Sequence, residues 1–222
     1  MSELASEPES TGPARSAAPS ASEVRRLSWL VFDYGEVISR RTQAVPLLAE
    51  RMGAPVEEFE PAYWPARDQY DRGGSDLDYW NAVGAPLGIQ VDQALSDELT
   101  KIDIEGWLPT DEGTLRLLAD LSAAGAQLAL LSNAPVSFAR VAEHQPWTEH
   151  FQHLVFSGDL AVAKPDAEIW AALVRRLGTT PGECLFLDDR QVNIDGARRA
   201  GLRAQLWPGA EAVRPLLAEF GV

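Results

Sequence analysis

Four positions in the chain carry side chains that could together transfer a phosphoryl group. Two adjacent carboxylates repel each other unless a cation lies between them. Hard oxygen ligands with no His or Cys nearby favour Mg²⁺ as that cation. With a further carboxylate as nucleophile, a small hydroxyl donor and a lysine, Mg²⁺ suits phosphoryl transfer through an aspartyl-phosphate. The residues concerned are Asp33, Ser132 with Asn133, Lys164, and the pair Asp188 and Asp189.

Three of these positions follow short apolar runs that we predict to be buried strands. A carboxylate inside such a strand would carry a large desolvation cost, so the polar residues belong at the strand ends. Parallel strands place their carboxyl ends along one edge of a sheet, where open α/β sheets bind ligands. Lys164 precedes an expected helix and can reach the same edge. The predicted strands are 29–32, 127–131 and 184–187, which end in Asp33, Ser132-Asn133 and Asp188-Asp189.

Strands and helices alternate through the second half of the chain. Buried strands that alternate with helices imply a parallel sheet covered on both faces. We therefore predict an α/β fold, with a Rossmann-like parallel sheet, helices on both faces and an inserted helical cap. The further strands are expected over 154–156 and 204–207, and the helices over 111–124, 136–145, 167–177, 192–200 and 210–219.

The inserted segment spans residues 43–108 and contains no convincing strand. We expect short helices there over 43–52, 57–64, 75–83 and 91–104, separated by glycines. The core domain would comprise 25–42 and 109–222, and residues 1–24, rich in Ser, Ala, Pro and Glu, would form a disordered tail. The aromatic residues of the insertion either form a compact helical core or partly line a substrate pocket under a lid. They are Phe59, Tyr63, Trp64, Tyr70, Tyr79 and Trp80.

Composition narrows the classes of partner. The chain has 222 residues, of which 45% are hydrophobic, so we expect one domain or one domain with an insertion. The net charge of −14 argues against nucleic acid or an anionic membrane surface as the partner, but not against a small phosphorylated substrate. No apolar stretch approaches the roughly 18–20 residues that span a bilayer. With one cysteine and no secretory signal pattern, we expect a cytoplasmic protein, and nothing indicates its oligomeric state.

Four motifs in this order resemble those of the haloacid dehalogenase-like (HAD) superfamily, subfamily IA. They are Val31–Val37, Leu130–Asn133, Lys164–Asp166 and Phe186–Asp189. The run that continues the fourth motif to Gly201 is similar to that of small-sugar-phosphate phosphatases and of the N-terminal phosphatase domain of epoxide hydrolases. The insertion resembles the helical cap of that subgroup in Tyr70–Gly73 and Tyr79-Trp80. The resemblance covers residues 27 to about 215.

The resemblance implies a set of ligands for Mg²⁺. Asp33 would be both the nucleophile and a metal ligand, and the backbone carbonyl of Gly35 would be a second ligand. Asp189 would bind the ion, and Asp188 would bind it directly or through water. Asn193 would brace the loop that carries them.

The resemblance also implies how the phosphoryl group is held. Ser132 would donate a hydrogen bond to the transferring group, with Asn133 beside it. Lys164 would neutralise charge on Asp33 and on the phosphoryl oxygens. The expected substrate is a small phosphorylated metabolite.

The chain departs from the family at Gly35, where most phosphatases of the family carry an Asp as general acid and base. Loss of such a group typically costs roughly 10²–10⁴ in rate. Glu36 could supply the proton, directly or through water, or it could be a surface or capping carboxylate. Three hypotheses follow: a Mg²⁺-dependent phosphatase, a catalytically weakened or regulatory HAD-like protein, and a haloacid dehalogenase-type hydrolase. The last reaction needs no metal, so the pair Asp188-Asp189 speaks against it.

Three arginines are weaker candidates. Arg40 and Arg41 follow the first motif and could meet an anionic substrate or remain solvated. Arg72 could lie in the cap pocket or pair with Asp71 or Asp76.

We expect replacement of Trp64 or Trp80 in the lid to alter relative activity among substrates.

Overall fold

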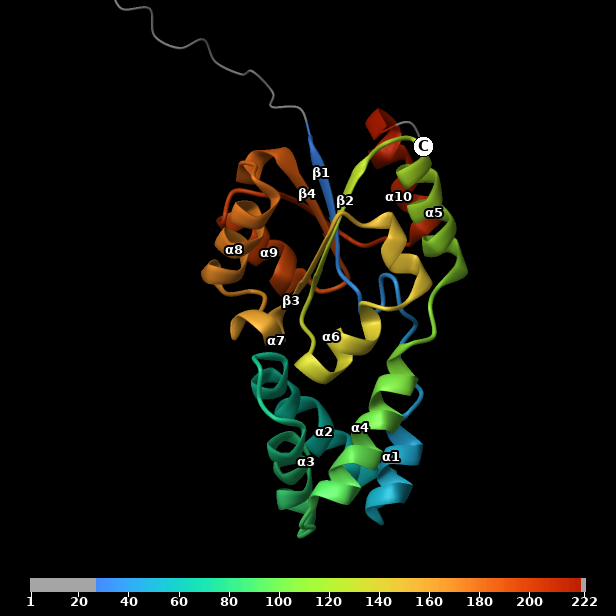
Figure 1. Ribbon diagram of the computed structural model, residues 1–222, viewed down its shortest axis with the longest axis vertical. Coiled ribbons are helices and arrows are strands. Elements are labelled where there is room, and N and C mark those ends of the chain that lie inside the picture. The colour runs from blue at the N-terminus through green and yellow to red at the C-terminus, as the bar shows by residue number, and fades with distance from the viewer. Residues whose placement is uncertain (1–26, 221–222) are drawn as a thin grey trace, which may run out of the picture.

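A parallel sheet of five strands forms the centre of the computed structural model, which describes residues 27–220 (Figure 1). The strand order β3-β2-β1-β4-β5 and the parallel pairing confirm the predicted α/β fold. The prediction for residues 1–24 lies outside the described residues. The strands are β1 (Trp29–Phe32), β2 (Gln127–Ser132), β3 (His153–Phe156), β4 (Cys184–Asp188) and β5 (Arg203–Leu206).

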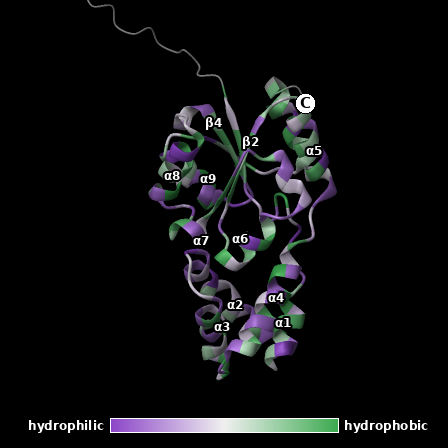
Figure 2. Cartoon of the chain, viewed as in Figure 1, coloured by the Kyte–Doolittle hydropathy of each residue, from purple (hydrophilic) through white to green (hydrophobic). Residues whose placement is uncertain are grey.

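Helices cover both faces of this sheet, as predicted (Figure 1). Successive side chains of a strand point to opposite faces, so Leu30 and Phe32 enter one core and Trp29 and Val31 the other. Figure 2 shows the apolar strands between the two mixed helical layers. On the first face lie α5 (Glu112–Ala123), α6 (Val136–Ala142) and α10 (Ala210–Val213), and on the second α8 (Ala167–Leu177) and α9 (Gln191–Arg199). Shorter elements are α7 (Ser157–Leu160), η2 (Pro146–His150), η3 (Pro181–Glu183) and η4 (Arg214–Phe220).

A separate group of helices lies beyond the carboxyl ends of the strands (Figure 1). We call this group, residues 45–107, the helical insertion. It has its own hydrophobic core, in which Phe59, Tyr63 and Trp80 are fully buried. Its elements are α1 (Val45–Met52), α2 (Val56–Asp71), α3 (Asp76–Gly84), η1 (Ala85–Leu87) and α4 (Gln93–Trp107).

Four predicted helix ends are wrong by three residues or more. Helix α4 ends at Trp107 rather than at 104, and α6 ends at Ala142 rather than at 145. Helix α2 was expected to end at Trp64, but it continues to Asp71 through Pro61 and Pro65. Both prolines lie on the exposed side of α2, while Tyr63 and Tyr70 are packed into the core and hold the helix together. At the carboxyl terminus of the chain, the single helix expected over 210–219 is a short α-helix followed by the 3₁₀-helix η4. Pro215 lacks the N–H that would continue the α-helical hydrogen bonds.

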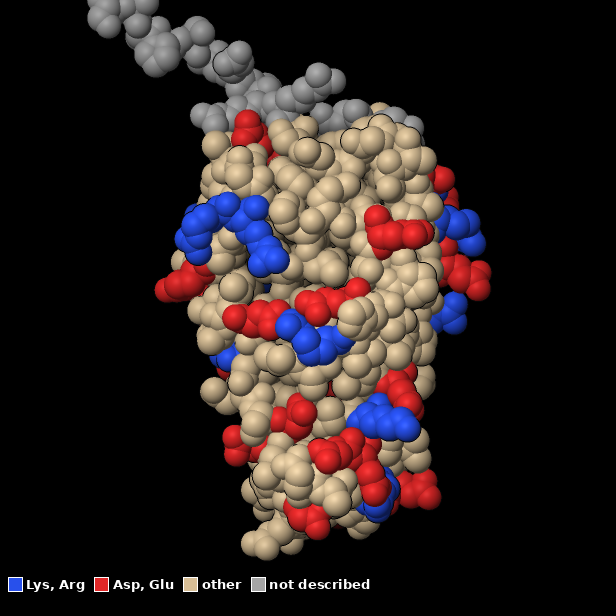
Figure 3. Space-filling view, viewed as in Figure 1, with Lys and Arg blue, Asp and Glu red and all other residues tan. Residues whose placement is uncertain are grey.

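The surface in Figure 3 carries acidic and basic side chains that are interspersed. Within residues 27–220, no helix combines the length and the apolar character needed to cross a bilayer.

Candidate active site

A cavity of about 730 Å³ lies between the carboxyl ends of the strands and the helical insertion. The core contributes Asp33, Ser132, Lys164 and Asp189 to its lining. Ser132 ends β2, and Asp33 directly follows β1. The cavity therefore lies at the sheet edge where the polar strand ends were expected to meet.

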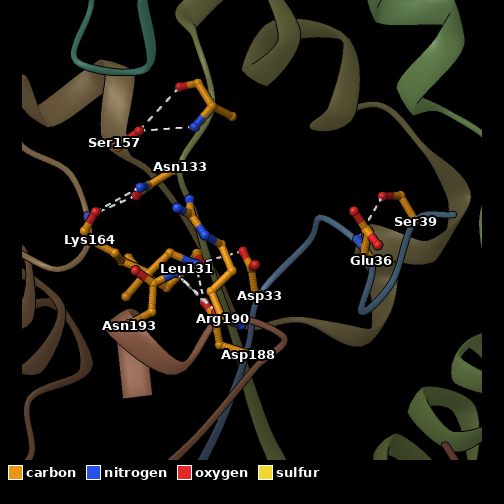
Figure 4. Close-up of polar contacts among 11 residues, drawn as sticks. Asp33, Glu36, Ser39, Leu131, Asn133, Ser157, Lys164, Asp188, Arg190 and Asn193 are labelled. Atoms are coloured by element: carbon orange, nitrogen blue, oxygen red, sulfur yellow. Dashed lines mark hydrogen bonds and ion pairs between the residues drawn. The ribbon is translucent and has the colours of Figure 1, made fainter. Parts of the chain in front are cut away.

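Lys164 is the centre of the charged group on the core side (Figure 4). Its Nζ donates hydrogen bonds to Asp33 Oδ1 at 2.6 Å, to Asp188 Oδ2 at 2.8 Å and to Leu131 O at 2.9 Å. The side chain of Lys164 is only 1% exposed. Three acceptors thus fix the position of one buried cation.

The backbone of Lys164 is held by a single amide side chain. Asn133 Nδ2 donates to Lys164 O at 2.9 Å, and Lys164 N donates to Asn133 Oδ1 at 2.8 Å. These two bonds join the loop after β2 to the segment before α8. Asn133 therefore positions Lys164, in addition to lining the cavity beside Ser132.

Asp188 is fully buried and both of its oxygens are occupied. Asn193 Nδ2 donates to both oxygens at 3.0 Å, and Arg190 N donates to Oδ1 at 2.8 Å. With Lys164, these donors hold the loop between β4 and α9 in place. Asn193 thus braces Asp188 directly.

The charges of this group shift one another's pKa values. Burial raises the pKa of Asp33 to about 8, against the opposing attraction of Lys164. Burial also raises the pKa of Asp189 to about 6, and the nearby Asp188 and Glu36 add to that rise. Burial disfavours the charged form of Lys164, but Asp188 and Asp33 outweigh it and raise the pKa of the lysine. The group therefore holds more negative charge than one lysine neutralises.

The core side of the cavity offers ligands for a cation. Oxygen atoms of Asp33, Asp188 and Asp189 all lie within 4.8 Å of one another. The amide oxygen of Asn193 is buried beside them and has no hydrogen-bond partner. Hard oxygen donors of this kind suit Mg²⁺, and the uncompensated negative charge favours a divalent ion.

The loop after β1 carries Gly35 and Glu36 along the cavity. A Cβ on Gly35 would meet only Trp107 Cζ3, at 3.8 Å, and the φ of Gly35 is not positive. Glu36 has a φ of 53° and an exposed side chain, and its N–H donates to Ser39 Oγ at 3.4 Å. Figure 4 shows Glu36 apart from the group around Lys164.

The insertion side of the cavity contains a charged group that the sequence reasoning missed. Arg67 Nη1 forms an ion pair with Asp103 Oδ2 at 2.7 Å, and Tyr63 Oη donates to Asp103 Oδ1 at 2.5 Å. Arg67 Nη2 lies 3.5 Å from Asp71 Oδ1. The guanidinium is also 5.9 Å from the ring centre of Trp107. Tyr63, Arg67 and Asp71 follow one another at helical spacing in α2, which was the available signal.

The predicted pairing of Arg72 is wrong. Arg72 pairs with Asp68 and Asp166 rather than with Asp71 or Asp76, because the end of α2 lies against the start of α8.

Of the two tryptophans expected to influence specificity, only Trp64 lines the cavity. Trp80 is buried in the core of the insertion, where Nε1 donates to Thr100 Oγ1 at 2.8 Å. Among the arginines of the first loop, Arg41 lines the cavity and Arg40 does not.

Comparison with known proteins identifies the family. A family profile of haloacid dehalogenase-like hydrolases matches residues 28–201. The chain therefore belongs to the haloacid dehalogenase-like hydrolases, as the four motifs predicted. A GMP/IMP nucleotidase of Escherichia coli is 30% identical over 128 residues, which make up 57% of this chain and 54% of the nucleotidase. The chain spans about half the length of the curated relatives it matches.

Solved structures share the fold. A HAD family enzyme of Bacteroides thetaiotaomicron, in complex with magnesium and inorganic phosphate, has a TM-score of 0.64 and 18% identity over 81% of this chain and 93% of that chain. An L-2-haloacid dehalogenase of Xanthobacter autotrophicus has a TM-score of 0.67 and 17% identity over 88% of this chain and 85% of that chain. At these identities the likeness shows the common fold and no common reaction.

Proposed function

We propose that the protein is a Mg²⁺-dependent phosphatase that hydrolyses a small phosphorylated metabolite through an aspartyl-phosphate. The observation that carries the proposal is the buried group of Asp33, Lys164, Asp188 and Asp189 at one end of the cavity. It combines a carboxylate nucleophile, a fixed cation and an acidic cluster that suits a divalent ion. Phosphoryl transfer needs these three components.

Asp33 attacks phosphorus in this proposal. Asp33, Asp189 and the carbonyl of Gly35 would hold Mg²⁺, and Asp188 would bind the ion directly or through water. The ion supplies positive charge that neutralises the phosphoryl oxygens. Lys164 holds the Asp33 carboxylate in place and adds a second positive charge beside those oxygens.

The phosphoryl group is held at the end of β2. Ser132 donates a hydrogen bond to it, and Asn133 holds the backbone of Lys164 in position through two hydrogen bonds. The helical cap of residues 43–108 closes over the core of 25–42 and 109–222. Trp64 and Trp107 meet the leaving group, because both line the insertion side of the cavity.

The relatives support a phosphomonoester substrate. The nucleotidase and a phosphoglycolate phosphatase of Pseudomonas putida both act on phosphate esters by name. The Bacteroides structure contains magnesium and phosphate in the same fold. Dehalogenation is the second candidate because of the Xanthobacter neighbour, but a dehalogenase has no use for the acidic cluster.

The test is hydrolysis of p-nitrophenyl phosphate by the full chain with Mg²⁺ and with EDTA, in parallel with chloride release from 2-chloropropionate. We expect Mg²⁺-dependent phosphate release that Asp33→Asn lowers by more than about 10³-fold, because an amide is a poor nucleophile. Asp195→Asn, which removes an exposed carboxylate from α9, is the matched control and should leave turnover unchanged. Full Mg²⁺-dependent turnover by Asp33→Asn would contradict the mechanism. Chloride release without phosphate release would favour the dehalogenase, and neither reaction would favour the regulatory protein.

A further inference from the structure

Among the described residues, five carboxylates line the cavity. They are Asp33, Glu36, Asp68, Asp71 and Asp189. Asp33 and Asp189 belong to the proposed metal cluster. Glu36 is exposed on the loop after β1, and the side chain of Asp68 is 72% exposed. Asp71 remains, and it comes from the helical insertion rather than from the core.

Asp71 is mostly buried, and its carboxylate is loosely held. Its side chain is 15% exposed, and Oδ1 is buried without a hydrogen-bond partner. Arg67 is 3.5 Å away but is already engaged by Asp103 at 2.7 Å. Burial raises the pKa of Asp71 to about 6; Arg67 and Arg190 oppose the rise, and Asp103 and Asp68 add to it. A carboxyl group of this kind can both give and take a proton near neutral pH.

The backbone of Asp71 is linked through Ser157 to the loop after β2. Ser157 Oγ donates to Asp71 O at 2.5 Å and accepts from Ala134 N at 2.9 Å. Ala134 lies two residues after Ser132, and Figure 4 shows Ser157 beyond Asn133, on the side away from Asp188. One hydroxyl group therefore joins the end of α2 to the loop proposed to hold the phosphoryl group.

The geometry of phosphoryl transfer places the leaving group on the same side of the cavity as Asp71. The attacking and leaving oxygens lie roughly in line on opposite sides of phosphorus. Asp33 attacks from the end of the sheet, so the leaving oxygen points away from the sheet and towards the insertion. Asp71 lies on that side of the cavity.

We propose that Asp71 is the general acid and base of the phosphatase, in place of the aspartate that Gly35 lacks. The inference rests on the proposed function. In the first step Asp33 forms a bond to phosphorus, the ester P–O bond breaks, and the Asp71 carboxyl proton goes to the leaving alkoxide. In the second step water attacks phosphorus, its proton goes to the Asp71 carboxylate, and phosphate leaves with Asp33 restored. Neither step oxidises or reduces any group.

The test compares two leaving groups in the full chain with Mg²⁺. Nitrophenolate leaves without a proton, whereas the alkoxide of glycerol 2-phosphate needs one. For Asp71→Asn we expect turnover of glycerol 2-phosphate to fall by roughly 10²-fold. With p-nitrophenyl phosphate, the first equivalent of nitrophenolate should appear in a burst at a rate within about 3-fold of wild type, followed by slow turnover. The burst arises because only the second step then lacks its base.

Asp68→Asn is the matched control, because Asp68 lies three residues earlier in α2 and lines the same cavity. We expect it to change both substrates by one common factor and to give no burst. Asp71→Glu restores a carboxyl group and should recover part of the glycerol 2-phosphate turnover. If Asp71→Asn slows the nitrophenolate burst as much as glycerol 2-phosphate turnover, or changes neither, Asp71 is not the acid. If wild type hydrolyses neither ester, the proposed function itself fails, and the role of Asp71 fails with it.

Discussion

Two clusters of buried charge border the cavity, one on the core and one on the helical insertion. On the core, three carboxyl groups lie together with one lysine, so with all three ionised the negative charge exceeds the positive charge by two. On the insertion, two carboxylates share one arginine, and the excess is one. A divalent cation suits the first excess and a single proton suits the second. For this reason we propose metal-assisted attack on the core side and proton transfer on the insertion side.

The two cations are also held in different ways. Lys164 is fixed by hydrogen bonds to two carboxylates and a backbone carbonyl. Arg67 packs against aromatic rings as well, with its guanidinium carbon between 5.5 and 5.9 Å from four ring centres, those of Tyr63, Tyr70, Tyr79 and Trp107. The insertion thus combines its charged group with its hydrophobic core, and removing the charge should affect folding as well as the site.

The largest stability effect should come from Arg67→Met. It leaves Asp103 buried without its cation, and breaking a buried pair costs about 3 kcal/mol or more. We expect the free energy of unfolding, measured with urea, to fall by that amount. Arg51→Met is the control, because the pair of Arg51 with Glu98 is about half exposed and such pairs contribute less than about 1 kcal/mol. Equal losses for the two variants would show that the buried pair contributes no more to the free energy of unfolding than the exposed pair.

The second effect concerns the pH dependence of stability at Asp71. Because burial raises its pKa from 3.8 to about 6, protonated Asp71 stabilises the folded state. That stabilisation is complete below 3.8 and is lost as the pH rises to about 6. Asp71→Asn lacks the ionisable group, so its stability relative to wild type should increase by about 2 kcal/mol between pH 4 and pH 7. Thermal unfolding across this range measures the stability of Asp71→Asn relative to wild type, with Asp195→Asn as the exposed control. A relative stability that decreases as the pH rises would contradict the effect expected from burial of Asp71.

The smallest effect should come from Gly35→Asp, which adds the family's usual acid to the core side. The backbone of Gly35 has no positive φ, and the new Cβ would meet only Trp107 at van der Waals distance. We expect turnover of glycerol 2-phosphate to rise by about 10-fold in wild type, and by more in Asp71→Asn, where the new acid has no competitor. Gly182→Asp, which has open space around its Cβ, is the control. An equal gain in both backgrounds would indicate that Asp71 transfers no proton.

Much of the fold could be predicted because its signals are local. Helix α8 has the bounds that its pattern predicts, 167–177, and ends at Gly178 in the left-handed conformation. Strand β1 has its predicted bounds, and β2 and β4 extend one residue further. The end of α2 could not be predicted, since the burial of Tyr70 outweighs the helix-breaking tendency of Pro65.

The sequence by itself determined which residues end the strands of the sheet. Apolar runs become buried strands, and an unpaired carboxylate inside such a run would carry a large desolvation cost, so residue types along single segments place Asp33 and Asp188 at the strand ends. Only the tertiary structure decided that Arg67 would pair with Asp103, 36 residues away, and that Ser157 would link Asp71 to the loop after β2. These contacts join different elements, and no local pattern records which helix packs on which. The core side of the site could therefore be predicted in outline, while the insertion side required the packed molecule.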